Sequence, residues 1–313
     1  MAMCFEGQVL KDNEMGEIAI TSRRPGRVWS ILQNPLSRIV LFAFALATMI
    51  SAIGWLSSTA GIASRSAAGI GVAVLQIVAT CAIYVGLVRW LEQRRVVEFG
   101  RHRAWGEFGA GFALGLALFG ITMLVLYLSG LAAFEHAAAW PGLIYPLAGA
   151  IATAFFEEIA VRGVLFRIVE EHLGTWLALA FSAAAFGALH AGNPGATVTS
   201  SIAIALEAGV LLAAAYIYTR RLWLAIGLHA AWNFAEGGIF GADVSGIDSH
   251  GLLATRLSGP PLVSGGSFGP EASVVAVAVC LISAVVLLSL AWRQSRIVAL
   301  RFPRPRAVSS DIA

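Results

Sequence analysis

Residues 142–169 read GLIYPLAGAIATAFFEEIAVRGVLFRIV, and this stretch decides the class of fold. It is apolar apart from Glu157, Glu158, Arg162 and Arg167. About 20 apolar residues in a helix are enough to cross the roughly 30 Å hydrocarbon core of a bilayer. Charged side chains are rare inside such helices and, where they occur, they face a protein interior or a wet cavity. The stretch therefore predicts a transmembrane helix that carries chemistry within the membrane.

The composition of the whole chain agrees with a membrane protein. Of its 313 residues, 58% are hydrophobic and only 12% are charged, whereas soluble domains carry about 25% charged residues. Such a chain has too little polar surface for a water-soluble globule, and it is too apolar to be disordered. No basic, polar face suitable for nucleic acid is visible. The three cysteines are too few and too scattered for a disulfide framework or a zinc cluster.

Eight apolar segments are long enough to span a bilayer, which predicts an all-α, polytopic transmembrane helical bundle. The expected spans are Ser37–Leu56, Ala68–Leu91, Phe108–Leu131, Gly142–Val169, Thr175–Ala191, Val198–Tyr218, Leu222–Phe240 and Ala272–Trp292.

The basic residues predict the orientation of these spans. Of the 21 Lys and Arg residues, 18 lie in the N-terminal arm, in alternate connections or in the C-terminal tail. Only Arg65 and Arg256 lie in the other connections. Basic residues accumulate on the cytoplasmic side of membrane proteins. We therefore expect both termini to be cytoplasmic.

This topology divides the chain into a cytoplasmic arm (1–36), a transmembrane domain (37–292) and a basic cytoplasmic tail (293–313). Within the domain, the basic segment 89–107 is interpreted as a topology anchor at the membrane surface. The segment 241–271 is rich in Gly, Ser and Pro, so we expect a flexible outer loop without chemistry.

Away from the span ends, where Arg38, Arg89 and Arg167 lie, charged residues and histidines occur only in the fourth to seventh segments, which predicts a polar interior built by four helices. They are Glu157, Glu158, Arg162, His190, Glu207, His229 and Glu236.

Glu157 and Glu158 are consecutive, so they point about 100° apart on a helix. Glu158 and Arg162 are four residues apart and are expected to pair on one face. Glu157 is then free to serve as a general base. The alternative is a buried ion network of all three that only holds helices together.

Two histidines and an amide complete the set. His190 ends its helix, where it is either a functional group or an interface anchor. His229 and Asn233 share one face at i,i+4 and suit hydrogen bonding to a developing oxyanion, or hydrogen bonding between helices. For Glu207 a structural role is favoured, and Glu236 faces either the same cavity or water.

A carboxylate, two histidines and an amide from three helices can hydrolyse a peptide bond without a covalent intermediate. Glu157, His190 and His229 are also a possible ligand set for zinc with an open water position. No His-Glu-x-x-His motif occurs in the chain, and no Asp lies in any expected span.

At these residues the chain resembles the CPBP intramembrane proteases, which include the type II CAAX prenyl endopeptidases and the bacterial Abi proteins. The resemblance rests on three motifs in order and covers roughly residues 140–240. These motifs are Glu-Glu-x-x-x-Arg (Glu157, Glu158, Arg162), Phe-x-x-x-His (Phe186, His190) and His-x-x-x-Asn (His229, Asn233).

The resemblance implies an intramembrane endopeptidase with a conical, water-accessible cavity. Glu157 is then the base, His190 its partner in activating water, and His229 with Asn233 the oxyanion hole. Glu158, Arg162 and Phe186 support the site. A metal-free mechanism is favoured, with zinc as the alternative.

We expect the substrate to be a peptide or a membrane-associated protein in a bacterial inner membrane, and the oligomeric state stays open. Two other classes of function compete with the protease. One is a proton-coupled transporter using Glu157, Glu207 and His190, and the other is a non-catalytic bacteriocin-immunity or scaffold protein.

Overall fold

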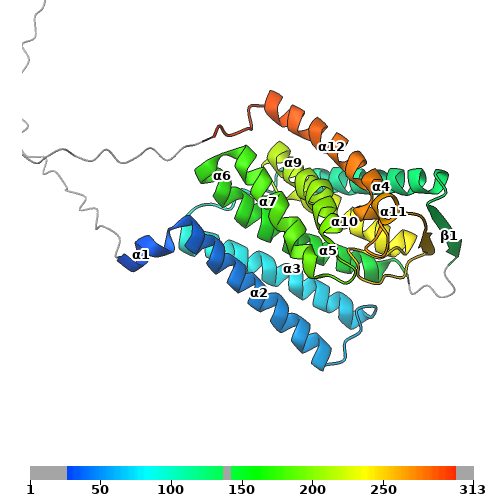
Figure 1. Ribbon diagram of the computed structural model, residues 1–313. Coiled ribbons are helices and arrows are strands. Elements are labelled where there is room, and N and C mark those ends of the chain that lie inside the picture. The colour runs from blue at the N-terminus through cyan, green and yellow to red at the C-terminus, as the bar shows by residue number, and fades with distance from the viewer. Residues whose placement is uncertain (1–26, 137–141, 301–313) are drawn as a thin grey trace, which may run out of the picture.

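The computed structural model describes residues 27–136 and 142–300. Most of the predicted N-terminal arm and the tail beyond residue 300 lie outside the described residues, so the predicted domain boundaries there stay predictions. The described chain is a bundle of long helices with one small two-stranded sheet (Figure 1). The all-α, polytopic fold predicted from the sequence is confirmed.

The first half of the chain forms two long hairpins of helices. Its elements are α1 (Arg27–Leu32), α2 (Pro35–Thr59), α3 (Ala67–Leu87), η1 (Val88–Glu92), α4 (Ala104–Leu128), β1 (Ala132–His136), α5 (Ile144–Glu158), η2 (Ile159–Phe166) and α6 (Arg167–Leu173).

The second half supplies the remaining helices of the bundle and its outer loop. Its elements are α7 (Thr175–Leu189), η3 (His190–Gly192), α8 (Val198–Ile204), η4 (Ala205–Gly209), α9 (Val210–Thr219), α10 (Trp223–Asn233), η5 (Phe234–Phe240), β2 (Leu253–Leu257), α11 (Pro261–Ser264), η6 (Pro270–Ala272) and α12 (Val274–Arg293).

Seven helices in the described ranges are long and apolar enough to cross a membrane, and they correspond to seven of the eight expected spans. The chain is an integral membrane protein. The eighth, Leu222–Phe240, is helical as α10 and η5 but is not apolar enough by this measure. Every residue of α10 from Leu224 to Trp232 is buried. Because other helices shield it from lipid, this helix tolerates the polar His229, Asn233 and Glu236.

Successive long helices run in opposite directions, so their ends lie at two opposite ends of the bundle. At one of these, which we call the basic end, polar contacts link the helix ends to each other. Arg38, before the middle of α2, binds Glu92 of η1 at 2.5 Å and Glu171 of α6 at 3.2 Å. The amide of Leu222, just before α10, donates to the carbonyl of Glu98 at 3.0 Å. Arg220, just after α9, binds Glu170 of α6 at 2.5 Å and the carbonyl of Arg296 beyond α12.

These contacts place the predicted cytoplasmic connections together, as the eight-span topology requires. In Figure 1, α1 and α6 lie toward this basic end, and β1 and the connection between α2 and α3 lie at the opposite end, called the outer end here.

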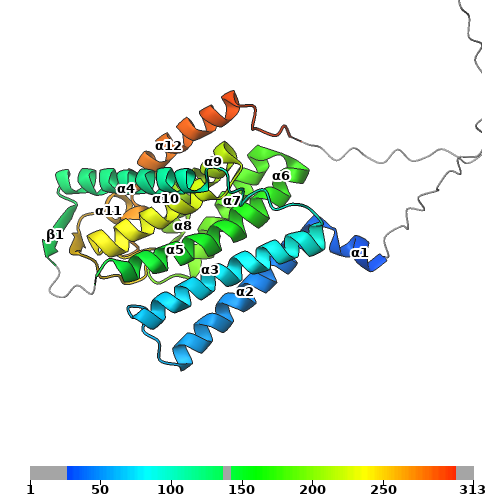
Figure 2. The same ribbon diagram turned by 180° about the vertical axis from the view of Figure 1, so that it is seen from behind.

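Small residues let the central helix pack closely against α4. A side chain at Gly111 or Gly115 of α4 would collide with the backbone of Leu224 or Leu228, and one at Gly227 would collide with Phe108. Close approach through small residues is a common way to join helices in membranes. Figure 2 shows α4 and α10 side by side along the bundle.

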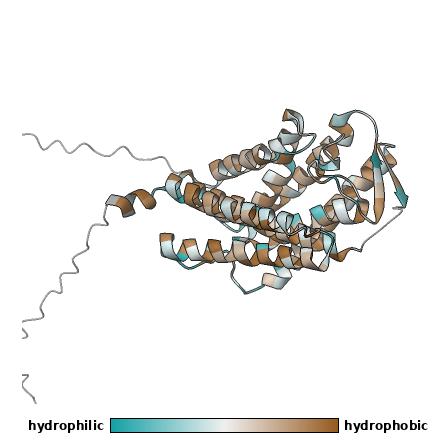
Figure 3. Cartoon of the chain, turned by 90° about the horizontal axis from the view of Figure 1, so that it is seen from below, coloured by the Kyte–Doolittle hydropathy of each residue, from teal (hydrophilic) through white to brown (hydrophobic). Residues whose placement is uncertain are grey.

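Large apolar side chains on the outer faces of the helices are exposed to the surroundings, as expected for contact with lipid. Examples are Phe44 of α2, Val78 of α3, Leu124 of α4, Phe181 of α7 and Val285 of α12. Figure 3 shows apolar residues spread along the helices and both apolar and hydrophilic residues on the two strands.

The outer end differs from the sequence-based expectation of a flexible loop. Strand β2 pairs antiparallel with β1, from Ala132 opposite Leu257 to His136 opposite Leu253. The loop also contains α11 and η6, and the amide of Gly246 donates to the carbonyl of Phe268 at 2.7 Å. The expectation failed because a Gly- and Pro-rich composition signals turns, whereas these turns are fixed by contacts with distant segments.

Candidate active site

Glu158 is the centre of a buried polar cluster behind the cavity. It lies at the end of α5, where the helix widens into the π-helical turn η2, a distortion frequent at functional sites. Its Oε1 accepts hydrogen bonds from Arg162 Nη1 at 2.8 Å and from His229 Nδ1 at 2.9 Å. The i,i+4 pair predicted from the sequence is present, and both partners are fully buried.

Arg162 ties two further helices, η4 and α7, to this cluster. Its Nη2 donates to the carbonyl oxygens of Ala208 and Gly209, each at 3.1 Å. Its guanidinium also lies 4.6 Å from the centre of the Phe186 ring, within reach of a cation–π interaction. Arg162 therefore links Glu158 to the backbone of η4 and to the Phe186 ring of α7.

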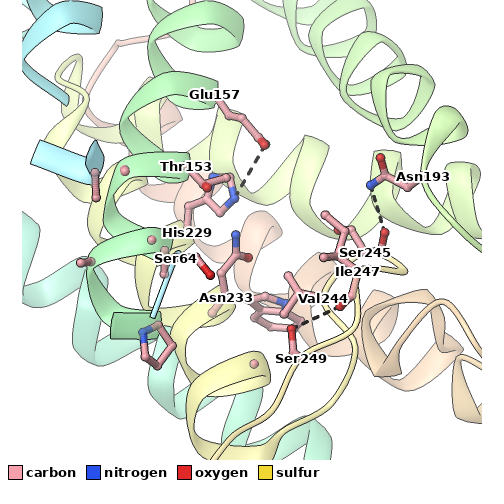
Figure 4. A pocket seen from close by; sticks show the side chains of 18 of the residues that line it. Ser64, Thr153, Glu157, Asn193, His229, Asn233, Val244, Ser245, Ile247 and Ser249 are labelled. Atoms are coloured by element: carbon pink, nitrogen blue, oxygen red, sulfur yellow. Dashed lines mark hydrogen bonds and ion pairs between the residues drawn. The ribbon is translucent and has the colours of Figure 1, made fainter. Parts of the chain in front are cut away.

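This cluster determines which nitrogen of His229 carries a proton. Because ionised Glu158 can only accept, the Nδ1 atom of His229 donates to it. The other nitrogen, Nε2, faces Glu157 with 3.9 Å between Nε2 and Oε2. Figure 4 shows the two side chains facing each other across the cavity, with Asn233 one turn further along α10.

His190 is held in a similar way on the neighbouring helix. Its Nδ1 lies 2.7 Å from the carbonyl oxygen of Phe186, so Nδ1 donates and Nε2 is left with its lone pair in the neutral ring. The Phe186 ring packs 4.7 Å from the His190 ring and 6.0 Å from the His229 ring, centre to centre. Phe186 is thus the spacer that holds the two imidazoles apart.

One cavity of about 520 Å³ joins these groups. It is lined by Glu157, Phe186, His190, His229 and Asn233, which the sequence placed on three separate helices. Glu158 and Arg162 lie behind this lining and do not face the cavity. The structure therefore brings the predicted set to one place, while the roles assigned to its members remain predictions.

The cavity also has polar lining that the sequence reasoning did not include. Thr153 stands one turn before Glu157, a spacing that could have identified it. Asn193 donates to the carbonyl of Ser245 at 2.9 Å and so ties η3 to the outer loop. For Ser245 and Glu271 no local pattern in the sequence gave a signal. Both reach the cavity only because the outer loop folds back over it.

A second group of carboxyls lies beside the first. Glu207 of η4, Glu236 of η5 and Glu271 of η6 are almost fully buried, and Glu207 and Glu271 line the cavity. Among the described residues, no N–H or hydroxyl donor reaches either carboxylate oxygen of Glu236. Burial raises the pKa of Glu271, which lies outside the membrane-spanning helices.

A metal site would require several ligating side chains close together in the described part of the chain. No group of three or more His, Cys, Asp or Glu residues in the described ranges is arranged to hold one. The set Glu157, His190 and His229, considered for zinc from the sequence, is not found as such a group, and both the metal-free and the zinc mechanism stay predictions. Within the described chain the cavity instead offers proton acceptors and hydrogen-bond donors.

Fold and site together define an all-helical integral membrane protein with acid–base groups around an internal cavity. Residues 138–235 match the family model described as Type II CAAX prenyl endopeptidase Rce1-like. The matched segment runs through α10 and contains all seven motif residues, so it confirms the resemblance drawn from the sequence. The family is a protease family, and the match supports a membrane peptidase. No curated protein and no solved structure is significantly similar to the chain.

Proposed function

We propose that this protein is an intramembrane endopeptidase that hydrolyses a peptide bond in a peptide or a membrane-associated protein. One observation carries the proposal. His229 is held by Glu158 at 2.9 Å and faces Glu157 at 3.9 Å, in a cavity that His190 and Asn233 also line. The matched protease family supports the same reaction class.

In the proposed mechanism, Glu157 accepts the proton of a water molecule in the cavity, while Nε2 of His190 orients that water by accepting a hydrogen bond from its other hydrogen. The hydroxide attacks the scissile carbonyl carbon, and the carbonyl oxygen becomes an oxyanion. When the tetrahedral intermediate collapses, the proton is returned to the leaving amine. General acid–base assistance of this kind contributes about 10²–10⁴-fold to a rate.

The oxyanion would be bound by Asn233 and His229. The Asn233 amide is a donor in any state, but His229 already uses its Nδ1 proton on Glu158. It can donate from Nε2 only as the doubly protonated imidazolium. Its two flanking carboxylates, Glu157 and Glu158, provide the negative charge that such a cation requires. No step in this mechanism needs a metal ion.

The decisive variant is Glu157→Gln, which keeps the size of the side chain and removes the base. Proteomic comparison of a deletion strain with a Glu157→Gln strain would first identify a substrate as an uncleaved species common to both. Cleavage of that substrate by purified Glu157→Gln protein should fall at least about 10²-fold. Glu135→Gln makes the same chemical change in an exposed pair with Arg256 and should leave the rate unchanged. Full activity of Glu157→Gln would show that the assignment is wrong.

The purified protein and its Glu157→Gln variant also test two other functions. The buried carboxyls Glu207, Glu236 and Glu271 favour a proton-coupled transporter as the second candidate. It predicts a Glu207-dependent flux in proteoliposomes, and an impermeable reconstituted protein would dismiss it. A non-catalytic immunity or scaffold protein would keep its biological effect after Glu157→Gln.

The location that we propose for the protease is a bacterial cytoplasmic membrane.

A further inference from the structure

The mouth of the cavity lies at the outer end of the bundle. Its rim includes Ser64 and Arg65, in the connection between α2 and α3, and Tyr145 at the start of α5. The outer loop contributes Asp248 and Ser249 to the same rim. Figure 4 shows Ser64 and Ser249 around the cavity that contains His229. The polar groups of the proposed active site are thus reached from this end.

The opposite end is closed. No residue that lines the cavity comes from the described segments at the basic end, 88–107, 167–175, 219–223 or 293–300. The cavity stops at the apolar side chains of Leu211, Leu212 and Leu228. Beyond them, Phe166 and Tyr216 pack edge to face at 5.5 Å, and both are buried.

The distribution of basic residues indicates which side of the membrane each end of the bundle faces. The closed end carries the connections with nearly all of the basic residues, and the mouth end carries Arg65 and Arg256. An excess of Lys and Arg marks the cytoplasmic side. The same orientation places the closed end against the cytoplasm and the mouth on the opposite side.

We propose that the cavity opens to the extracytoplasmic side and that the cleaved segment lies there. The substrate class is then an exported peptide or an extracytoplasmic segment of a membrane protein. A prenylated C-terminal motif at the cytoplasmic surface, the substrate in the name of the matched family, would have no entrance through this mouth. The statement that the bound segment is a substrate rests on the proposed function. The side of the membrane to which the mouth opens is inferred from geometry and charge alone.

The outer loop is fixed at the mouth by contacts with two neighbouring segments. Arg65 donates to the carbonyl of His250 at 2.7 Å and so links the α2–α3 connection to the loop. Gly246 has a φ of +78°, and a side chain there would collide with the carbonyl of Pro194. The loop is therefore docked tightly against the turn that follows His190.

Accessibility of single cysteines tests the sidedness directly. The background replaces Cys4, Cys81 and Cys280 with Ala, and the probes are Ser64→Cys and Asp248→Cys, on two independent segments of the rim. His102→Cys, exposed in the basic connection, is the matched control. Each variant is treated with a membrane-impermeant maleimide in intact cells stripped of any outer barrier, and in inverted membrane vesicles.

Both rim cysteines should be labelled at least about tenfold more in intact cells than in inverted vesicles, and His102→Cys should show the reverse. The use of two rim positions keeps the test valid if one variant fails to insert. Preferential labelling of the rim from the cytoplasmic side, or equal labelling from both sides, overturns the proposal.

A second readout separates this inference from the proposed function. Once a substrate is verified, a bulky maleimide on Asp248→Cys should lower its cleavage, and the same reagent on His102→Cys should not. Outward labelling in a protein that cleaves nothing would refute the peptidase and keep the sidedness. Cytoplasmic labelling in an active peptidase would refute the sidedness alone.

Discussion

Buried charge occurs at both ends of this molecule, but the two regions treat it differently. At the basic end, Glu92 binds Arg38, Arg94 and Arg167 at 2.5–2.7 Å, although its side chain is only 3% exposed. In the cavity, by contrast, Glu157 Oε2 has no hydrogen-bond donor among the described residues.

This difference distinguishes buried charges that stabilise the fold from buried charges that are available for chemistry. A buried ion pair whose partners are complete has little left to offer a substrate, and its loss leaves a partner stranded. A buried carboxylate without a donor costs stability and persists where it has another use. Burial alone does not distinguish the two regions, whereas pairing does.

The largest effect should follow from removing an oxyanion donor. His229→Ala and Asn233→Ala are each expected to lower the rate of cleavage by about 10²–10³-fold, as loss of such a donor does in other hydrolases. The rate should be measured on a verified substrate with correctly inserted protein. His172→Ala removes a histidine at the basic end, where its ring bonds the carbonyl of Ile168, and should keep full activity. Equal losses in all three would contradict the comparison.

Arg162→Met tests the fully buried ion pair behind the cavity. It strands Glu158 in a fully buried site, and such a loss costs about 3–5 kcal/mol of stability. The loss of stability is measured by unfolding the protein in mixed detergent micelles of increasing SDS content. The double variant Arg162→Met/Glu158→Gln removes the stranded charge and should recover part of the loss. A single variant as stable as the parent protein would show that the pair contributes nothing.

Arg167→Met makes the corresponding change at the basic end. Glu92 and Glu98 keep Arg94, and Glu92 keeps Arg38, so the expected cost is smaller, about 1–3 kcal/mol. The rate of cleavage per folded molecule should not change, because no group of the cavity is touched. A loss of rate without a loss of stability would mean that the basic end takes part in the reaction.

The smallest effect is expected at a half-exposed pair. Arg221 binds Glu107, and hydrogen bonding to that carboxylate raises the pKa of Arg221, so the arginine stays charged at every accessible pH. Exposed pairs contribute at most about 1 kcal/mol. Arg221→Ala should therefore lower stability by less than about 1 kcal/mol, with a difference that shrinks as salt is added. A salt-independent loss above this size would show that the pair is effectively buried.

The spans and their alternation were predictable because bilayer thickness and backbone hydrogen bonding leave a membrane chain few choices. The count of eight needed the structure for its interpretation. Leu222–Phe240 is helical, but it is less apolar than the other seven spans, and the structure shows why: it is the shielded centre of the bundle.

The candidate site was predictable where residues are near in sequence. The spacing of Glu158 and Arg162 predicted their pair, and the spacing of His229 and Asn233 predicted a shared face. The bond from His229 to Glu158, 71 positions apart, was not predictable, because it depends on how α5 and α10 pack. That bond assigns the proton of His229.

The sequence by itself determined the membrane location, the helical class and the identity of the motif residues, and it predicts the direction of each span. Each of these follows from local composition and spacing, which bilayer and helix geometry convert into structure. Only the tertiary structure decided that the outer loop folds over the cavity, that Glu271 reaches it and that the mouth lies opposite the basic end. Those features depend on contacts between segments far apart in the chain, and hydropathy and helical periodicity carry no information about such contacts.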